Sequence, residues 1–139
     1  MALAIKTKLA LAGALAGCAL AMTPTPASAT EIHQDLGTLT NYTSDDKWKS
    51  TANVNGQWNT SCTRVAARSG VNGWPAHPWR TSIRRASDTS GVFWSSYLAG
   101  AGRLCIENKN TGAWGDYYTR VTAGQTTRLT GIFVDHWAW

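Results

Sequence analysis

The chain contains 139 residues, of which 43% are apolar and 15% are charged, and its formal net charge at neutral pH is +5. The large apolar share excludes an intrinsically disordered polyelectrolyte, which cannot bury enough apolar surface to fold. No uninterrupted apolar run reaches the roughly 18 residues that a transmembrane helix needs, so the sequence predicts no membrane span.

The first 29 residues are typical of an export signal. Two lysines precede an apolar stretch at 9–22, and the small-x-small pattern Ala27-Ser28-Ala29, which a signal peptidase cuts, follows it. We therefore predict a signal peptide at residues 1–29 and a single secreted β domain at residues 30–139. These 110 residues are enough for one core and too few for two.

A second interpretation of this segment involves Leu15-Ala16-Gly17-Cys18, which resembles the lipobox of bacterial lipoproteins. The residues after Cys18 are apolar, whereas a lipoprotein usually has a polar tether there. Secretion is therefore the prediction, and lipid anchoring through Cys18 is the alternative to it.

Short runs of alternating or β-branched residues dominate the rest of the chain, and no long apolar pattern has helical spacing. Alternation places every second side chain on the same side, which is the pattern of a half-buried strand. The later runs are also rich in aromatic and β-branched residues, which favour pleated surfaces. In chain order, the predicted strands are Thr60–Ala67, Val92–Leu98, Arg103–Glu107, Tyr117–Thr122 and Arg128–Trp137.

Turn-forming residues separate these runs. Asparagine and glycine tolerate the positive φ of tight turns, and they predict turns at Asn55-Gly56, Asn72-Gly73, 108–112 and Ala123-Gly124. About seven short strands at this spacing predict an all-β fold, either an antiparallel β-sandwich or a small barrel.

Removal of the signal leaves two cysteines, Cys62 and Cys105. In an exported chain an even pair predicts one disulfide, which would contribute about 4 kcal/mol on the chain-entropy model. The histidines lie too far apart for zinc-site spacing, so we expect no metal and no cofactor. They are His33, His77 and His136.

The charges are distributed unevenly. Residues 30–46 contain four carboxylates and no lysine or arginine, whereas residues 47–87 contain seven cations and no carboxylate. Seven cations without a local partner predict a positive surface that attracts anionic partners. The alternative is a solvated face that pairs in part with the acidic N-terminal stretch.

Eight tryptophans are several times the usual number for a domain of this size, so we expect at least two or three to be exposed. The segment 73–80 is the main candidate, because its prolines make it stiff and neither helical nor an interior strand. Its alternative role is a lid over one end of the sandwich. We interpret Trp48 and Trp58 as packing residues, and Trp137 and Trp139 as anchors of the last strand or part of a second aromatic patch. The predicted binding residues are Trp74, His77, Trp79, Arg80, Arg84 and Arg85.

No nucleophile elbow, phosphate loop or H-E-x-x-H pattern occurs, so we expect no enzymatic activity. The enzyme alternative is a small secreted ribonuclease, which needs a carboxylate base, a histidine acid and arginines around the phosphate. Asp116, Arg120, Arg128 and Asp135-His136 look like the C-terminal part of the microbial guanyl-specific ribonucleases, although the catalytic glutamate of that family is missing.

From Cys105 onwards, and especially at 118–127, the sequence resembles the small secreted β-sandwich inhibitors of actinomycetes, in particular the tendamistat-like inhibitors of α-amylase. Those inhibitors push a Trp-Arg-Tyr loop into the active-site cleft of the amylase. Here the triplet is Trp79-Arg80-Thr81, so the resemblance implies a role for Trp79 and Arg80 only. The family has two disulfides, whereas this chain predicts one.

Three functions follow from these features. The first is a secreted inhibitor of an extracellular hydrolase, in which a rigid loop with Trp74, Trp79 and Arg80 enters the cleft of the target. The second is a carbohydrate- or cell-wall-binding module, with antimicrobial activity as one form of it. The third is the ribonuclease, tested at His136. The expected partner is thus an extracellular hydrolase or a polysaccharide, not nucleic acid, and the expected state is a monomer.

Overall fold

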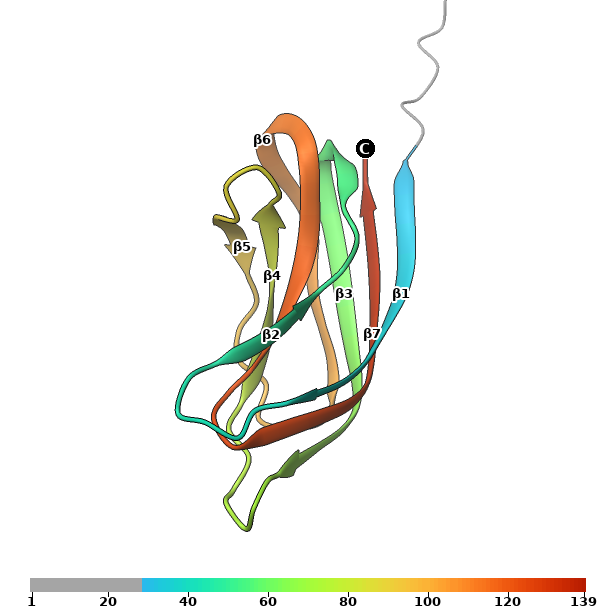
Figure 1. The fold of residues 1–139 in the computed structure, drawn as a ribbon. Coiled ribbons are helices and arrows are strands. Elements are labelled where there is room, and N and C mark those ends of the chain that lie inside the picture. The colour runs from blue at the N-terminus through green and yellow to red at the C-terminus, as the bar shows by residue number, and fades with distance from the viewer. Residues whose placement is uncertain (1–28) are drawn as a thin grey trace, which may run out of the picture.

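The computed structural model describes residues 29–139, and every regular element in this part of the chain is a β-strand (Figure 1). All strand pairs are antiparallel, in the order β1-β7-β3-β6-β4-β5, with β2 paired to β6. The sheet formed by the described residues is not closed, because β1, β2 and β5 each pair with one other strand. The predicted all-β fold is therefore confirmed, and its barrel form is wrong. The strands are β1 (Thr30–Thr40), β2 (Lys47–Ser50), β3 (Val54–Gly70), β4 (Trp79–Arg85), β5 (Gly91–Trp94), β6 (Gly102–Ala123) and β7 (Thr127–Ala138).

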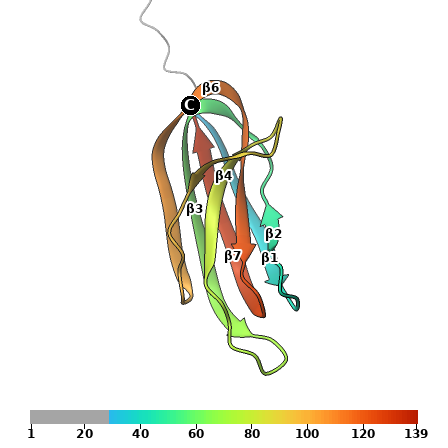
Figure 2. The same cartoon turned by 90° about the vertical axis from the view of Figure 1, so that its left-hand side faces the viewer.

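Strand β6 creates two facing layers because it turns back on itself (Figures 1 and 2). Its first part pairs with β3 as far as Asn110, and its last part pairs with β4 and β2. Between them, residues 115–117 pair with the start of β3 at residues 54–56. The bend, which we call the arch (residues 108–116), contains the predicted turn, where Asn108 and Gly112 have positive φ. One layer therefore contains β1, β7, β3 and the start of β6, and the other contains the end of β6 with β2, β4 and β5.

The core lies between these layers and is filled by alternate residues of the facing strands. Strands with a period of two place one set of side chains inward and the other set toward water. In β7, for example, Ile132 and Val134 are fully buried while Phe133 is exposed. The main core cluster contains Leu36, Leu39, Val65, Trp79, Val121, Ala123, Leu129, Ile132 and Val134.

The middle of the sandwich is polar. Ser61 Oγ and Thr119 Oγ1 are 2.6 Å apart, and Thr63 Oγ1 donates a hydrogen bond of 3.0 Å to Thr81 Oγ1, in both cases from one layer to the other. These hydroxyl groups are buried, so each hydrogen bond replaces one that water would otherwise supply. We call this group of buried residues the polar seam; it consists of Asn59, Ser61, Thr63, Thr81, Thr119 and His136.

The predicted turn at Asn55-Gly56 is wrong, because both residues lie inside β3. Gly56 instead lets β3 approach the end of β7 closely, since a Cβ atom at this position would lie 2.7 Å from the Cβ of Ala138. The turns at Asn72-Gly73 and after Ala123 are confirmed, and Asn72 and Gly73 have positive φ.

The predicted strands at 60–67, 103–107, 117–122 and 128–137 lie within β3, β6 and β7. The strand predicted at Val92–Leu98 is shorter, since β5 ends at Trp94 and only Leu98 forms an isolated bridge, to Trp79. Strands β1, β2 and β4 were not predicted.

The predicted signal peptide and Cys18 lie outside the described residues, apart from Ala29. Within residues 29–139 there is no helix with the length and apolar character that membrane crossing requires.

Candidate functional site

The outer face of the layer formed by β2, β6, β4 and β5 carries a cluster of arginine and aromatic side chains. Alternation in β4 turns Trp79, Thr81 and Ile83 toward the core and Arg80, Ser82 and Arg84 toward the outer face. Ser82 is nevertheless buried, and its hydroxyl oxygen accepts a hydrogen bond of 3.2 Å from Arg84 Nε. Neighbouring strands add their own outward residues at matching positions, since Ser82 pairs with Arg120 of β6 on one side and with Trp94 of β5 on the other. We call this cluster the arginine–aromatic face; it consists of Trp48, Arg80, Arg84, Trp94, Tyr97, Tyr118 and Arg120.

Two arginines of β4 stack on the same indole. The Arg80 guanidinium carbon lies 4.2 Å from the ring centroid of Trp94, and that of Arg84 lies 4.5 Å from it. Arg80 is also 4.9 Å from the ring of Tyr97. These distances are within the range of cation–π attraction, so the indole holds both cations in place.

The third arginine, Arg120, has its own aromatic partners. Its guanidinium carbon lies 3.7 Å from the ring centroid of Trp48, and its Nη2 donates a 3.0 Å hydrogen bond to the hydroxyl oxygen of Tyr118. Trp48 is 51% exposed and Trp94 is 44% exposed, so both indoles stay on the surface, whereas Tyr118 is buried. Trp48 therefore packs across strands, as predicted, but not in the core, and Trp58 is also exposed.

Within the described part of the chain, no carboxylate forms an ion pair with these three arginines. The ion pairs formed within residues 29–139 involve His33 and Arg85 only. Burial, and then the charge of Arg120, lowers the pKa of Arg84 from its ordinary value, with a smaller contribution of Arg80 in the same direction. A guanidinium stays charged at all physiological pH values, so the face carries uncompensated positive charge.

This arrangement can bind anionic groups. Arginine presents several N–H donors in a planar fork that matches carboxylate, phosphate and sulfate oxygens. The aromatic rings fix the forks in advance, which reduces the side-chain entropy that a ligand must overcome. The predicted residues Arg80 and Arg84 belong to this face, and Arg120, Trp48, Trp94, Tyr97 and Tyr118 were not predicted.

The structure corrects the predicted recognition loop at Trp79, which lies in the core and not in the loop. Its side chain is completely buried in the core cluster, and its Nε1 donates a hydrogen bond of 2.8 Å to the carbonyl oxygen of Gly100. The loop ends at Pro78, and Trp79 starts β4, where alternation turns it inward and Arg80 outward. The implied role of Trp79 in binding is therefore wrong.

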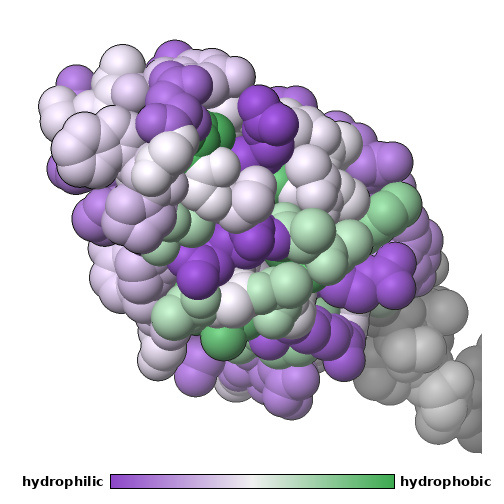
Figure 3. All heavy atoms as spheres, turned by 90° about the horizontal axis from the view of Figure 1, so that it is seen from below, coloured by the Kyte–Doolittle hydropathy of each residue, from purple (hydrophilic) through white to green (hydrophobic). Residues whose placement is uncertain are grey.

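The remaining loop, residues 71–78, is fixed to the body of the protein. Arg68 Nη1 donates hydrogen bonds to the carbonyl oxygens of Ala76 and His77, at 2.7 and 3.0 Å, and the backbone N–H of His77 donates to Thr127 Oγ1 at 2.7 Å. Trp74 projects from this loop and is 66% exposed. Seen from the end that carries the loop, apolar and hydrophilic residues are interspersed (Figure 3).

The other two predicted binding residues lie in different cavities. His77 lines a cavity of about 320 Å³ together with Tyr97 and Gln125. Arg85 faces away from Arg84, forms an ion pair with Asp88 at 3.5 Å, and lines a cavity next to the arch. The structure thus brings together only Arg80 and Arg84 of the six predicted residues.

The residues of the ribonuclease hypothesis do not converge. His136 is completely buried in the polar seam, and burial lowers its pKa to about 4. Asp116 lies at the arch, and Arg120 points outward from the other layer. A general acid must reach the atom that it protonates, so His136 cannot take the role that this hypothesis gives it.

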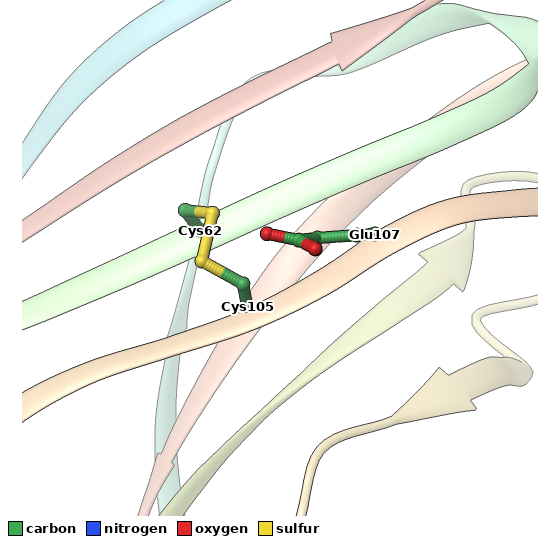
Figure 4. A group of neighbouring side chains, drawn as sticks. All are labelled: Cys62, Cys105 and Glu107. Carbon is green, nitrogen blue, oxygen red and sulfur yellow. A yellow bond between two sulfur atoms is a disulfide. The ribbon is translucent and has the colours of Figure 1, made fainter.

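The predicted disulfide is confirmed: Cys62 and Cys105 are directly opposite each other on β3 and β6 and are bonded (Figure 4). Glu107 lies beside the two sulfurs, and these three residues are the one group within residues 29–139 with the proximity of a metal site. A metal ligand is the thiolate form of cysteine, and both sulfurs are taken up by the disulfide. The group therefore cross-links two strands and offers one carboxylate.

Comparisons with known proteins add no family assignment. No protein-family model matches the chain, and no curated protein matches it.

Proposed function

We propose that the protein is a secreted binding module for an anionic extracellular polysaccharide, and that the arginine–aromatic face is its binding surface. The observation that carries this proposal is the set of three fixed arginines without a carboxylate partner, on one face of a sheet. A polymer with repeated carboxylate, phosphate or sulfate groups can engage several forks at once, and multivalent contact raises the overall affinity. The disulfide supports the predicted export, because such bonds persist in oxidising compartments.

The position of the rings favours an anionic polymer over a neutral one at this face. A neutral sugar binds mainly by stacking on a free aromatic surface. Here a guanidinium already lies over Trp94 and over Trp48, so each indole gives part of its surface to an arginine. Arg84 already donates through Nε to Ser82 and through Nη1 to Thr89. Arg120 Nη2 donates to Tyr118, and the Nε atoms of Arg80 and Arg120 are buried. The groups left to meet a ligand are the remaining terminal N–H donors of the three guanidinium groups, which are selective for oxygen anions.

Binding to polygalacturonate or heparin is the first test, with dextran as a neutral polymer of the same kind. Replacement of Arg80, Arg84 and Arg120 by alanine is expected to weaken binding to the polyanions by at least about 10-fold, because each arginine contributes charged hydrogen bonds. Binding should also weaken as salt is added, since exposed charges are screened. Isothermal titration calorimetry at several salt concentrations measures both effects.

The matched control removes the same charge from the other layer. Arg64, Arg103 and Arg128 are exposed there on β3, β6 and β7, and their replacement by alanine should leave binding almost unchanged. An equal loss in both triple variants would show that net charge alone causes the binding. Absence of binding to either polyanion, or preference for a single-stranded DNA oligonucleotide, would also contradict the proposal.

The inhibitor hypothesis keeps one supporting observation, the exposed Trp74 on a loop that hydrogen bonds hold rigid. A rigid loop loses little entropy when it enters a cleft. We therefore propose inhibition of an extracellular hydrolase as the second candidate, through Trp74 without Trp79. Stoichiometric protein should then inhibit at least one enzyme of a panel of amylases, glycosidases and proteases, and Trp74→Ala should abolish the inhibition. Unchanged activity of every enzyme would refute this candidate.

A further inference from the structure

The arch and the end of β4 lie at the opposite end of the sandwich from the 71–78 loop (Figure 1). Residues of both line a second cavity. Its volume is about 600 Å³, which is within the range of sites for small ligands. Trp114, Asp116 and Tyr117 line it from the arch and β6, and Arg85 and Ser87 line it from β4 and the turn that follows. None of these residues belongs to the arginine–aromatic face.

Hydrogen bonds fix the backbone of the arch on both sides of Trp114. Tyr117 is buried, and its hydroxyl group donates a hydrogen bond of 2.8 Å to the carbonyl oxygen of Ala113. Thr111 Oγ1 donates to the carbonyl oxygen of Gln57 at 2.6 Å, and the N–H of Ala86 donates to the carbonyl oxygen of Asp116 at 2.8 Å. These bonds join the arch to both layers.

The indole of Trp114 is nevertheless 60% exposed. An exposed indole on a fixed backbone contributes little to the core, and it offers a flat apolar surface to a ligand. Its position in the wall of the cavity means that a bound molecule would lie against the ring.

The charged groups of the cavity restrict the class of that ligand. Asp116 accepts a hydrogen bond of 3.1 Å from Asn55 Nδ2, and no other side chain within residues 29–139 hydrogen-bonds to its carboxylate. Arg85 supplies donors on the facing side, although its charge is partly balanced by Asp88 at 3.5 Å. An anion would be attracted by Arg85 but repelled by Asp116, and an amine would meet the reverse, so the two charges favour neither class. A neutral ring with several hydroxyl groups can donate to the carboxylate and accept from the guanidinium.

We propose that this cavity binds a neutral pyranose unit of an oligosaccharide. The apolar face of the sugar ring stacks on Trp114, and its hydroxyl groups bond to Asp116 and Arg85. The site is independent of the proposed polyanion surface, because the two share no residue, and either can fail without the other.

Titration with neutral trisaccharides tests the proposal. The probes are cellotriose, chitotriose and maltotriose, and the readout is the indole N–H signal of Trp114 in the NMR spectrum of nitrogen-15-labelled protein. At least one probe should shift this signal saturably, together with the backbone signals of Arg85 and Asp116. Trp114→Ala should weaken binding roughly 10-fold, the effect expected for one aromatic stacking contact, and Trp114→Phe should weaken it less because a ring is retained.

The matched control is Trp74→Ala, which removes an equally exposed indole from the opposite end. Its affinity for the same trisaccharide should equal that of the unmodified protein. Failure of all three probes to shift the Trp114 signal would overturn the proposal, and so would tighter binding of trigalacturonate than of the neutral sugars at this site. Replacement of Arg80, Arg84 and Arg120 should not change the titration, which separates this result from the test of the arginine–aromatic face.

Discussion

Trp79→Ala is expected to lower the free energy of unfolding by about 3 to 5 kcal/mol, the range for truncation of a large buried aromatic residue. The indole is completely buried, so alanine would leave a cavity between the two layers. The substitution would also remove the donor to the carbonyl oxygen of Gly100, which lies 2.8 Å from Nε1. Urea unfolding at neutral pH, followed by circular dichroism, measures the change.

Trp74→Ala is the matched control, because the same side chain is removed from a position that is 66% exposed. Surface substitutions away from special features usually change stability by less than about 0.5 kcal/mol. The two variants remove the same side chain from positions only five residues apart, so the difference between their free energies of unfolding reports the burial of Trp79. A loss of similar size in the two variants would mean that Trp79 does not occupy the core.

This pair also shows how far the sequence predicts the fold. The alternating runs and the turn residues predict an antiparallel all-β domain, because these patterns are local in the sequence. The even cysteine pair predicts the disulfide, because two cysteines can pair in only one way. The direction of Trp79 depends on where β4 begins. Two prolines just before it favour a loop that continues through 80, whereas Trp79 already pairs with Ala123 of β6 and also forms a bridge to Leu98.

The candidate site is less accessible to sequence reasoning. Arg80 is predicted as a binding residue from the 73–80 loop and from the resemblance to the inhibitors, and Arg84 from its place in the basic segment 47–87. Their neighbour Arg120 comes from a strand that pairs with β4 through long-range contacts, and sequence alone does not supply this register. A usable signal is the strand pattern itself: in residues 79–84, every second residue is a large apolar residue or threonine, with arginine or serine between them.

Hydropathy patterns do not predict the polar seam, because the buried positions of these strands contain serine, threonine and histidine where a core pattern has apolar residues. At its centre, His136 Nε2 lies 2.9 Å from Asn59 Oδ1, and Nδ1 lies 3.0 Å from Thr119 Oγ1. The amide oxygen can only accept, so Nε2 carries a proton, and in the neutral imidazole Nδ1 accepts from the threonine. The folded seam requires this neutral form because burial penalises the charged imidazole.

That requirement predicts a loss of stability in acid. Burial lowers the pKa of His136 in the folded protein to about 4, from an ordinary value of 6.5. The unfolded chain thus takes up a proton first as the pH falls. The contribution of the neutral histidine is complete above pH 6.5 and is lost progressively as the pH falls toward 4. The expected decrease in the free energy of unfolding over this interval is about 3 kcal/mol.

The variant His136→Gln tests this prediction, because glutamine can accept from Thr119 and donate to Asn59 without titrating. The variant is expected to be less stable at pH 7.5, since its amide does not reproduce the shape of the ring. Its loss of stability between pH 7.5 and pH 4 should be smaller than that of the unmodified protein by about 3 kcal/mol. The carboxylates titrate in both proteins and cancel in this difference, and so does exposed His33, whose pKa is raised mainly by its hydrogen bond to Asp135. Urea unfolding at the two pH values gives the four free energies. Equal acid sensitivity of the two proteins would show that His136 is not the group that couples protonation to unfolding.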